Sequence, residues 1–99
     1  MRIVSRKTLK EFWESKGRED AEQPLKAWFA EASSAAWLKM SDIKERYPNA
    51  SIVDRERVVF NIGGNKYRLV VKVWFPARAL FIKFIGTHAD YDAIDVTSL

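Results

Sequence analysis

Cysteine does not occur among the 99 residues of this chain. Its absence excludes disulfide bonds and thiolate metal sites, and it fits a protein that works in a reducing compartment. Long hydrophobic runs are also missing, because no apolar stretch approaches the roughly 20 residues that a helix needs to span a bilayer. Internal repeats, low-complexity segments and linkers are absent as well. We therefore expect a single domain over residues 1–99.

The N-terminus lacks the apolar segment of a secretory signal peptide. Residues 1–7, Met-Arg-Ile-Val-Ser-Arg-Lys, become charged at once, whereas a signal peptide continues into an uncharged core. Together with the missing cysteines, this beginning predicts a cytoplasmic protein that is not attached to a membrane.

The residues that are present belong to a folded protein. Hydrophobic residues make up 47% of the chain and aromatic residues 13%, which is too apolar for a disordered tail. A domain of this size buries roughly two-thirds of the surface that its unfolded chain exposes, so it can fold without disulfide bonds or a structural metal ion.

Positive charge is concentrated in the second half of the chain. Between Arg55 and His88 there are seven Lys or Arg residues and one acid, whereas residues 1–50 carry ten basic and eight acidic side chains. The net charge is +4. This distribution indicates an anionic partner, most simply a nucleic acid, and the alternative is an ordinary solvated face of a basic protein.

The first half of the chain predicts helices. The hydroxyl of Ser5 is placed to cap a helix over Arg6–Lys16, and Gly17 suits the left-handed position just past its end. A second helix begins near Asp20–Gln23, where acids complement the helix dipole, and a short third helix covers Asp42–Arg46. Three aromatic residues in this region could form a ligand box, but their helical spacing favours core packing: Trp28, Phe29 and Trp37.

The second half predicts an antiparallel sheet. Long strands over Arg57–Ile62, Lys66–Phe75 and Ala79–Ile85 are separated by turns at residues 63–65 and 76–78. Residues 2–4 add an edge strand. This order predicts an α+β fold in which the two N-terminal helices pack on one face of a small, mostly antiparallel sheet. The other face of the sheet is expected to be open.

Side chains alternate between the two faces of a strand, which sorts the long strands into core and open positions. The expected core face of the middle strand carries Tyr67, Leu69, Val71, Val73 and Phe75. Its open face carries Lys66, Arg68, Val70, Lys72 and Trp74. In the last strand, Leu80, Ile82 and Phe84 fit the core, while the opposite face takes Phe81, Lys83 and Ile85. We therefore expect the side chains of four basic residues to lie close together on the open face: Lys66, Arg68, Lys72 and Lys83.

The only histidine, His88, lies just beyond the last strand, where residues 87–92 predict a loop or a short turn of helix. Histidine can give or take a proton near neutral pH, and Tyr91 can stack on a base. The alternative is a surface histidine without a special role. His88, Asp90 and Asp92 could also be interpreted as metal ligands. Because the nearby cations oppose a metal, we expect neither a metal nor another cofactor.

Two segments resemble a known family. Asn61–Val73 (Asn-Ile-Gly-Gly-Asn-Lys-Tyr-Arg-Leu-Val-Val-Lys-Val) and Phe81–Asp95 (Phe-Ile-Lys-Phe-Ile-Gly-Thr-His-Ala-Asp-Tyr-Asp-Ala-Ile-Asp) closely resemble HigB-type toxins of bacterial type II toxin–antitoxin systems, which belong to the RelE-like mRNA interferases. The similarity runs nearly end to end, including Asp20–Trp37 and Ser51–Ile62. It implies a RelE-like α+β fold with a concave basic sheet face. It also implies metal-independent cleavage of mRNA, commonly on the translating ribosome.

The resemblance also implies residue roles. The family's strand arginine corresponds to Arg68, and the functional position after the last strand falls on His88 with Tyr91 close behind. RNA is cut without metal when its 2′-OH attacks the adjacent phosphate, which requires a base, an acid and cations for the developing charge. His88 suits the base or the acid, and the planar fork of Arg68 suits the phosphate. The expected RNA-binding residues are Lys66, Lys72, Lys83 and Arg57.

Partners follow from the same resemblance. It implies mRNA and the ribosome as targets and a cognate helix-turn-helix antitoxin of the HigA type, with operator DNA bound only through the antitoxin complex. One alternative is a non-catalytic RNA- or ribosome-binding module that uses the same basic face. A third possibility is a structural protein that binds another protein through exposed Trp74 and Phe81.

Overall fold

Three long strands form an antiparallel meander at the centre of a five-stranded sheet. They are β3 (Arg57–Ile62), β4 (Tyr67–Trp74) and β5 (Ala79–Thr87), and the computed structural model describes all 99 residues. Short β1 (Arg2–Val4) lies parallel to β5, and β2 (Ser51–Ile52) lies antiparallel to β3, giving the order β1-β5-β4-β3-β2. The sheet is therefore mixed, with one parallel edge.

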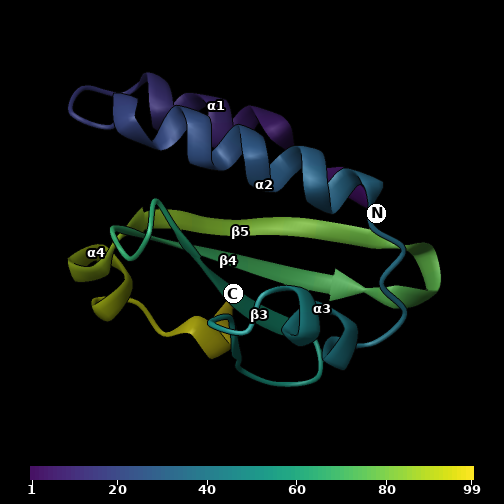
Figure 1. Ribbon diagram of the computed structural model, residues 1–99. Helices are drawn as coiled ribbons and strands as arrows, with labels where there is room; N and C mark the ends of the chain where they lie inside the picture. The colour runs from purple at the N-terminus through teal and green to yellow at the C-terminus, as the bar shows by residue number, and fades with distance from the viewer.

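Two antiparallel helices cover one face of this sheet, as Figure 1 shows. They are α1 (Arg6–Glu14) and α2 (Glu22–Ser34), and the turn between them contains Gly17 at φ +82°. Two shorter helices follow, α3 (Met40–Arg46) and α4 (His88–Asp92), and the α+β fold predicted from the sequence is confirmed. No helix in the structure has both the length and the apolar composition that spanning a membrane requires.

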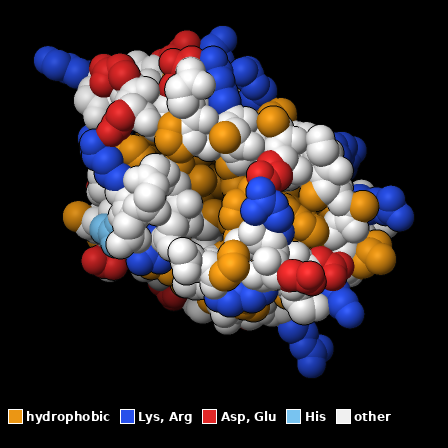
Figure 2. Space-filling view, in the orientation of Figure 1, with side chains coloured by type: hydrophobic (Ala, Val, Ile, Leu, Met, Phe, Trp, Pro, Cys, Tyr) orange, Lys and Arg blue, Asp and Glu red, His pale blue; other side chains and the backbone are white.

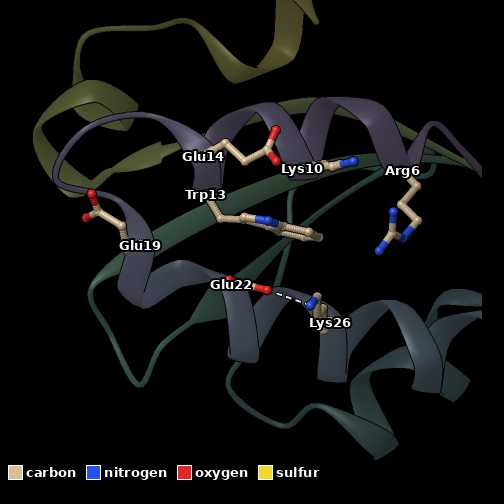
Figure 3. Close-up of a pocket in the computed structure, with 7 residues that line it drawn as sticks. All are labelled: Arg6, Lys10, Trp13, Glu14, Glu19, Glu22 and Lys26. Carbon is tan, nitrogen blue, oxygen red and sulfur yellow. Dashed lines mark hydrogen bonds and ion pairs between the residues drawn. The ribbon is translucent and has the colours of Figure 1, made fainter.

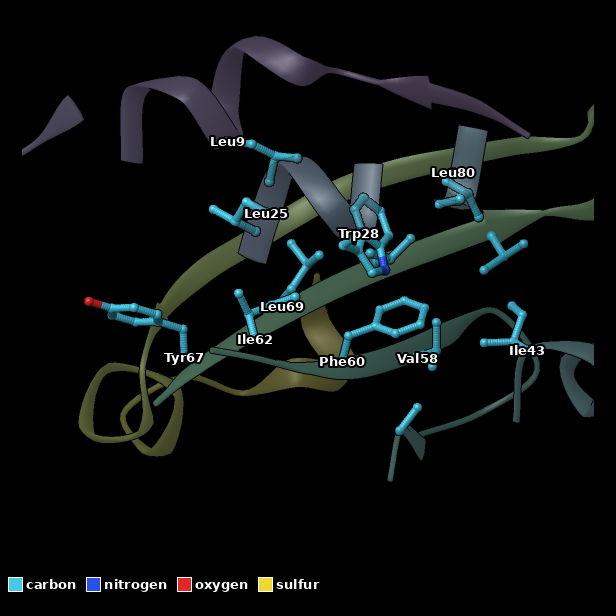
Figure 4. Close-up of a cluster of buried hydrophobic side chains, with 14 of the residues drawn as sticks. Leu9, Leu25, Trp28, Ile43, Val58, Phe60, Ile62, Tyr67, Leu69 and Leu80 are labelled. Atoms are coloured by element: carbon cyan, nitrogen blue, oxygen red, sulfur yellow. The ribbon is translucent and has the colours of Figure 1, made fainter. Parts of the chain in front are cut away.

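The core lies between the helices and the inward face of the sheet (Figure 4). Tyr67, Leu69, Val71 and Val73 are buried in it, as the alternation along β4 predicts. The predicted aromatic packing is also confirmed, since Phe60 lies against the rings of two buried tryptophans. Its ring centroid is 5.3 Å from that of Trp28 and 6.5 Å from that of Trp37. These aromatic side chains fill the core rather than a ligand pocket.

Several expected boundaries differ by one or two residues. The first helix ends at Glu14 rather than Lys16, and the hydroxyl of Ser5 makes no capping hydrogen bond although Ser5 holds the N-cap position. The middle strand begins at Tyr67 rather than Lys66, because residues 63–66 form the turn, and it ends at Trp74. The last strand continues to Thr87, two residues past the expected end.

A β-bulge in β5 reverses the predicted faces of two residues. Val70 pairs with Phe84 and Val71 with Ile82, so Lys83 is an extra residue in β5. Such an insertion shifts the alternation by one position. Ile85 therefore packs against the core, and Phe84, predicted to be inside, lies on the opposite face.

The face opposite the helices is not fully open, which corrects another expectation. Val59 and Val70 are aligned across β3 and β4 on this face, and both are completely buried without belonging to the core cluster. The C-terminal segment returns from α4 to β3 (Figure 1), where Arg57 Nε donates a 3.0 Å hydrogen bond to the carbonyl of Leu99. This segment covers part of the face that alternation alone leaves exposed.

Candidate active site

Arg68 projects from the second residue of β4 on the face opposite the helices. Its Cα partners are Asn61 on β3 and Gly86 on β5. Gly86 is buried, and a Cβ at this position would meet the Phe84 ring at 2.7 Å and the Asp90 side chain at 3.1 Å. A glycine beside Arg68 therefore lets the end of β5 and α4 approach each other closely.

A capping box fixes the start of α4 directly after β5. The amide of Asp90 donates to Thr87 Oγ1 at 3.1 Å, and the Thr87 amide donates to Asp90 Oδ2 at 3.2 Å. These reciprocal bonds satisfy two of the free amides at the helix start. His88 and Tyr91 are three residues apart in this helix, so they share one of its sides.

The structure brings the three predicted catalytic residues together. Arg68 Nε donates a 3.2 Å hydrogen bond to His88 Nε2, and the guanidinium carbon of Arg68 lies 5.3 Å from the ring centroid of Tyr91. The Tyr91 ring in turn lies against Phe84, with the centroids 6.4 Å apart. All three predicted residues are half-buried, so the polar groups are held by packing yet open to solvent.

Asn65 belongs to the same cluster, although the sequence had indicated only a turn residue there. Its Oδ1 lies 3.2 Å from His88 Nε2, the nitrogen that also contacts Arg68. Neutral Nε2 accepts from Arg68, whereas protonated Nε2 donates to the Asn65 oxygen. Both protonation states of the imidazole are therefore provided with a hydrogen-bond partner.

Lys66 does not lie with Arg68, which corrects the predicted convergence. It lies in the turn and forms an ion pair with Asp20, the residue that also accepts a 2.5 Å hydrogen bond from the Tyr67 hydroxyl. The hydrogen bond from Lys66, followed by that from Tyr67, lowers the pKa of the Asp20 carboxyl, and Asp20 raises the pKa of Lys66. This trio links the β3–β4 turn to the start of the helical layer.

The other predicted RNA-binding residues fall at the far end of the sheet face. The Arg57 side chain is only 15% exposed and is held by Asp54 at 2.8 Å and by the Leu99 carbonyl. Lys72 is paired with Glu56 at 3.5 Å, and Lys83 is exposed in the bulge. Arg57 thus makes structural contacts, while Lys72 and Lys83 keep their charges near solvent.

A cavity of about 550 Å³ lies elsewhere, between α1 and α2 (Figure 3). Arg6 and Lys26 each lie 5.5 Å from the Trp13 ring centroid and close over its indole. Three basic and three acidic side chains line this cavity with Trp13, so their charges balance. On the face shown in Figure 2, basic and acidic side chains are likewise interspersed along the outline of the molecule, and neither charge forms a continuous patch.

The predicted metal alternative finds no support in the arrangement of α4. The Asp90 carboxylate turns back to the Thr87 amide and serves the cap. Elsewhere in the chain, no three His, Asp or Glu side chains converge as metal ligands would.

Comparison with known proteins shows which family the chain belongs to. Residues 21–94 match the family model described as HigB_toxin, the RelE-like toxic component of a toxin–antitoxin system. The chain belongs to the HigB toxin family. Similar family members include the "mRNA interferase toxin HigB" of Escherichia coli strain K12 and the "mRNA interferase HigB" of Shigella flexneri. Each is 30% identical over 95 residues, covering 93% of this chain and 88% of the relative.

Removing the hydroxyl of Thr87 tests whether the capping box holds α4 in this HigB-family protein. Thr87→Val keeps the side-chain shape but leaves the Asp90 amide without its acceptor, which costs about 0.5–2 kcal/mol of helix stability. We expect faster hydrogen exchange at the Asp90 amide and loss of the Arg68–His88 contact, both measured by NMR. Thr87→Ser retains the acceptor and should match the wild type. Unchanged exchange in Thr87→Val would show that the cap does not hold α4.

The Asp20 trio predicts a pH dependence of stability. Because the folded-state pKa of Asp20 is lowered, its contribution is present above the unfolded pKa of about 3.9 and is lost as the pH falls through the folded value. Urea unfolding across pH should therefore show Asp20→Asn less stable than wild type at neutral pH. That difference should shrink below about pH 4. Glu45→Gln, an exposed change on α3, is the matched control. A difference that persists unchanged into acid would contradict this assignment.

Proposed function

We propose that this protein is an mRNA interferase that cuts RNA at the cluster of Arg68, His88 and Tyr91. The observation that carries the proposal is the 3.2 Å contact between the Arg68 guanidinium and the His88 imidazole. It joins a phosphate-binding cation to a proton-transfer group on an exposed sheet face. Relatives named mRNA interferases support the substrate class.

The reaction that fits this cluster is attack by the RNA 2′-oxygen on the adjacent phosphorus. The new O2′–P bond forms as the bond to the 5′-oxygen breaks, so a proton leaves the 2′-OH and another reaches the departing oxygen. Charge accumulates on the phosphoryl oxygens during this exchange, where a positioned cation is most effective. The Arg68 guanidinium can bind two of those oxygens at once through its planar fork.

His88 is the proton-transfer group of the proposal. Arg68 provides a donor to its neutral form and Asn65 an acceptor for its protonated form, so Nε2 can change protonation state with the ring held in place. When a phosphate draws the Arg68 N–H groups away, Nε2 is freed to face the reacting oxygens. A positioned general acid or base contributes roughly 10²–10⁴-fold to the rate.

Tyr91 completes the cluster from α4. Its ring lies against the Arg68 guanidinium, which orients the arginine, and its half-exposed face can stack on a base beside the scissile phosphate. Of the four proposed RNA-binding residues, Lys83 is exposed on this side of the sheet, and Lys72 is partly exposed there beside Glu56. Lys66 and Arg57 have a secondary role, because the ion pair of Lys66 with Asp20 holds the turn and the hydrogen bond of Arg57 to the Leu99 carbonyl holds the C-terminal segment.

As the toxic component of a toxin–antitoxin system, the protein has a cognate antitoxin. We infer that this antitoxin is a HigA-like helix-turn-helix protein through which the pair contacts operator DNA. The target is mRNA on the translating ribosome, and the compartment is the cytoplasm. Support for this part of the proposal comes from the family and from the basic second half of the chain.

Substitution of the cluster tests the proposed chemistry. His88→Ala and Arg68→Ala should each abolish growth arrest and reduce mRNA cleavage, by about 10²–10⁴-fold for His88→Ala. Arg68→Lys, which keeps the charge without the fork, should be intermediate. Primer extension on a reporter mRNA in a translating extract measures cleavage, and circular dichroism checks folding.

The control variant is Lys10→Ala, which removes an exposed charge from the helical layer and should cleave like the wild type. Full cleavage by both alanine variants of the cluster would refute the assignment. Growth arrest that persists in His88→Ala without any mRNA cleavage would favour the non-catalytic RNA-binding module instead.

A further inference from the structure

Trp74 is the one tryptophan of the four in this chain that is exposed. Its side chain is 54% accessible at the end of β4, whereas Trp13, Trp28 and Trp37 are at most 6% accessible. The buried three serve the core, but the packing of the fold does not account for an indole in solvent. Single exposed apolar residues are common, so the surroundings of Trp74 decide whether it has a function.

A groove of about 350 Å³ lies beside Trp74 on the sheet. Its lining consists of Lys72, Val73, Trp74, Phe81 and Lys83. The register places Phe81 directly opposite Lys72, and the bulge in β5 adds Lys83 next to them. Two aromatic rings and two ammonium groups therefore come from adjacent strands to one concave surface.

This combination has the chemistry of a site for single-stranded nucleic acid. Nucleobases stack on exposed aromatic side chains whatever their sequence, and flanking cations attract the phosphates. Lys83 makes no ion pair, and Lys72 has only the partly exposed Glu56 at 3.5 Å. A surface for an apolar protein partner would instead be depleted in lysine, so the two ammonium groups favour RNA.

The groove also lies on the face that carries the proposed active site. Lys72 follows Arg68 by four residues on the same side of β4, a separation of about 13 Å along the strand. The C-terminal segment covers the β3 side between them, where Leu99 reaches Arg57. A strand of RNA leaving Arg68 therefore has its open route over β5, past Phe84 and Lys83, to Trp74.

We propose that this groove is a subsite for the substrate mRNA, in which a base a few nucleotides from the cut stacks on Trp74 and Phe81. The flanking phosphates contact Lys72 and Lys83. The inference rests on the proposed function and adds a positioning role for two aromatic residues. It accounts for an indole and a bulge that the cleavage chemistry itself does not use.

The fluorescence of Trp74 provides a direct test with the complete chain. A 2′-deoxy oligonucleotide of mixed sequence cannot be cut through a 2′-OH, so titration with it measures binding alone. We expect saturable quenching of the exposed indole and binding that weakens steeply with salt. Trp74→Ala should weaken binding by about 5- to 150-fold, the loss of one stacked base, while Trp74→Phe should retain most of it.

Leu38→Ala is the matched control, because it removes another exposed apolar side chain, 65% accessible, between α2 and α3. It should bind like the wild type. Binding by Trp74→Ala at wild-type strength would overturn the subsite even if His88→Ala still abolishes cleavage, which keeps this inference distinct from the proposed function. An association with antitoxin or ribosomal protein that depends on Trp74, without any oligonucleotide binding, would also overturn it.

Discussion

Burial of one apolar row on β4 is the constraint on which the rest of this structure depends. Tyr67, Leu69, Val71 and Val73 pack against α1 and α2, and a strand cannot bury one row without turning the alternate row away. Arg68, Lys72 and Trp74 are thereby placed on the opposite face, at fixed intervals along one strand. The core packing that stabilises the fold thus also aligns the cation, the basic groove and the exposed indole.

The positions of His88 and Tyr91 depend on separate local contacts at the end of β5. Gly86 allows α4 to pack close to the end of β5, and the reciprocal Thr87–Asp90 hydrogen bonds fix where the helix begins. Without this cap, a five-residue helix has too few internal hydrogen bonds to hold itself in place. His88 and Tyr91 therefore meet Arg68 because a strand, a glycine and a capping box are joined in sequence, within residues 86–91.

Much of this arrangement could be predicted from the sequence, because alternation and capping are local rules. The core row of β4, the strand Arg57–Ile62 and the two-helix layer follow from hydrophobic periodicity. The approach of His88 and Tyr91 to Arg68 agrees with the predicted hairpin and the family resemblance. Prediction failed where long-range packing decides the outcome.

The errors have distinct physical causes. The bulge at Lys83 depends on pairing with β4, so nothing within β5 alone shows that Ile85 faces inward. Lys66 was misplaced because its partner, Asp20, is 46 residues away. At Asn65 the sequence pattern indicates only a turn, and its contact with His88 comes from the fold. The burial of Val59 and Val70 depends on where the C-terminal segment runs, which the strand pattern does not predict.

We propose that the cluster of Arg68, His88 and Tyr91 cleaves RNA through the substrate's own 2′-oxygen. The chemical ends of the products test it most directly, by mass spectrometry of fragments from a defined mRNA. Attack by the 2′-oxygen should give an upstream fragment ending in a 2′,3′-cyclic phosphate and a downstream fragment beginning with a 5′-hydroxyl. Fragments with 3′-hydroxyl and 5′-phosphate ends would contradict it, because they require an external nucleophile and a different bond to break.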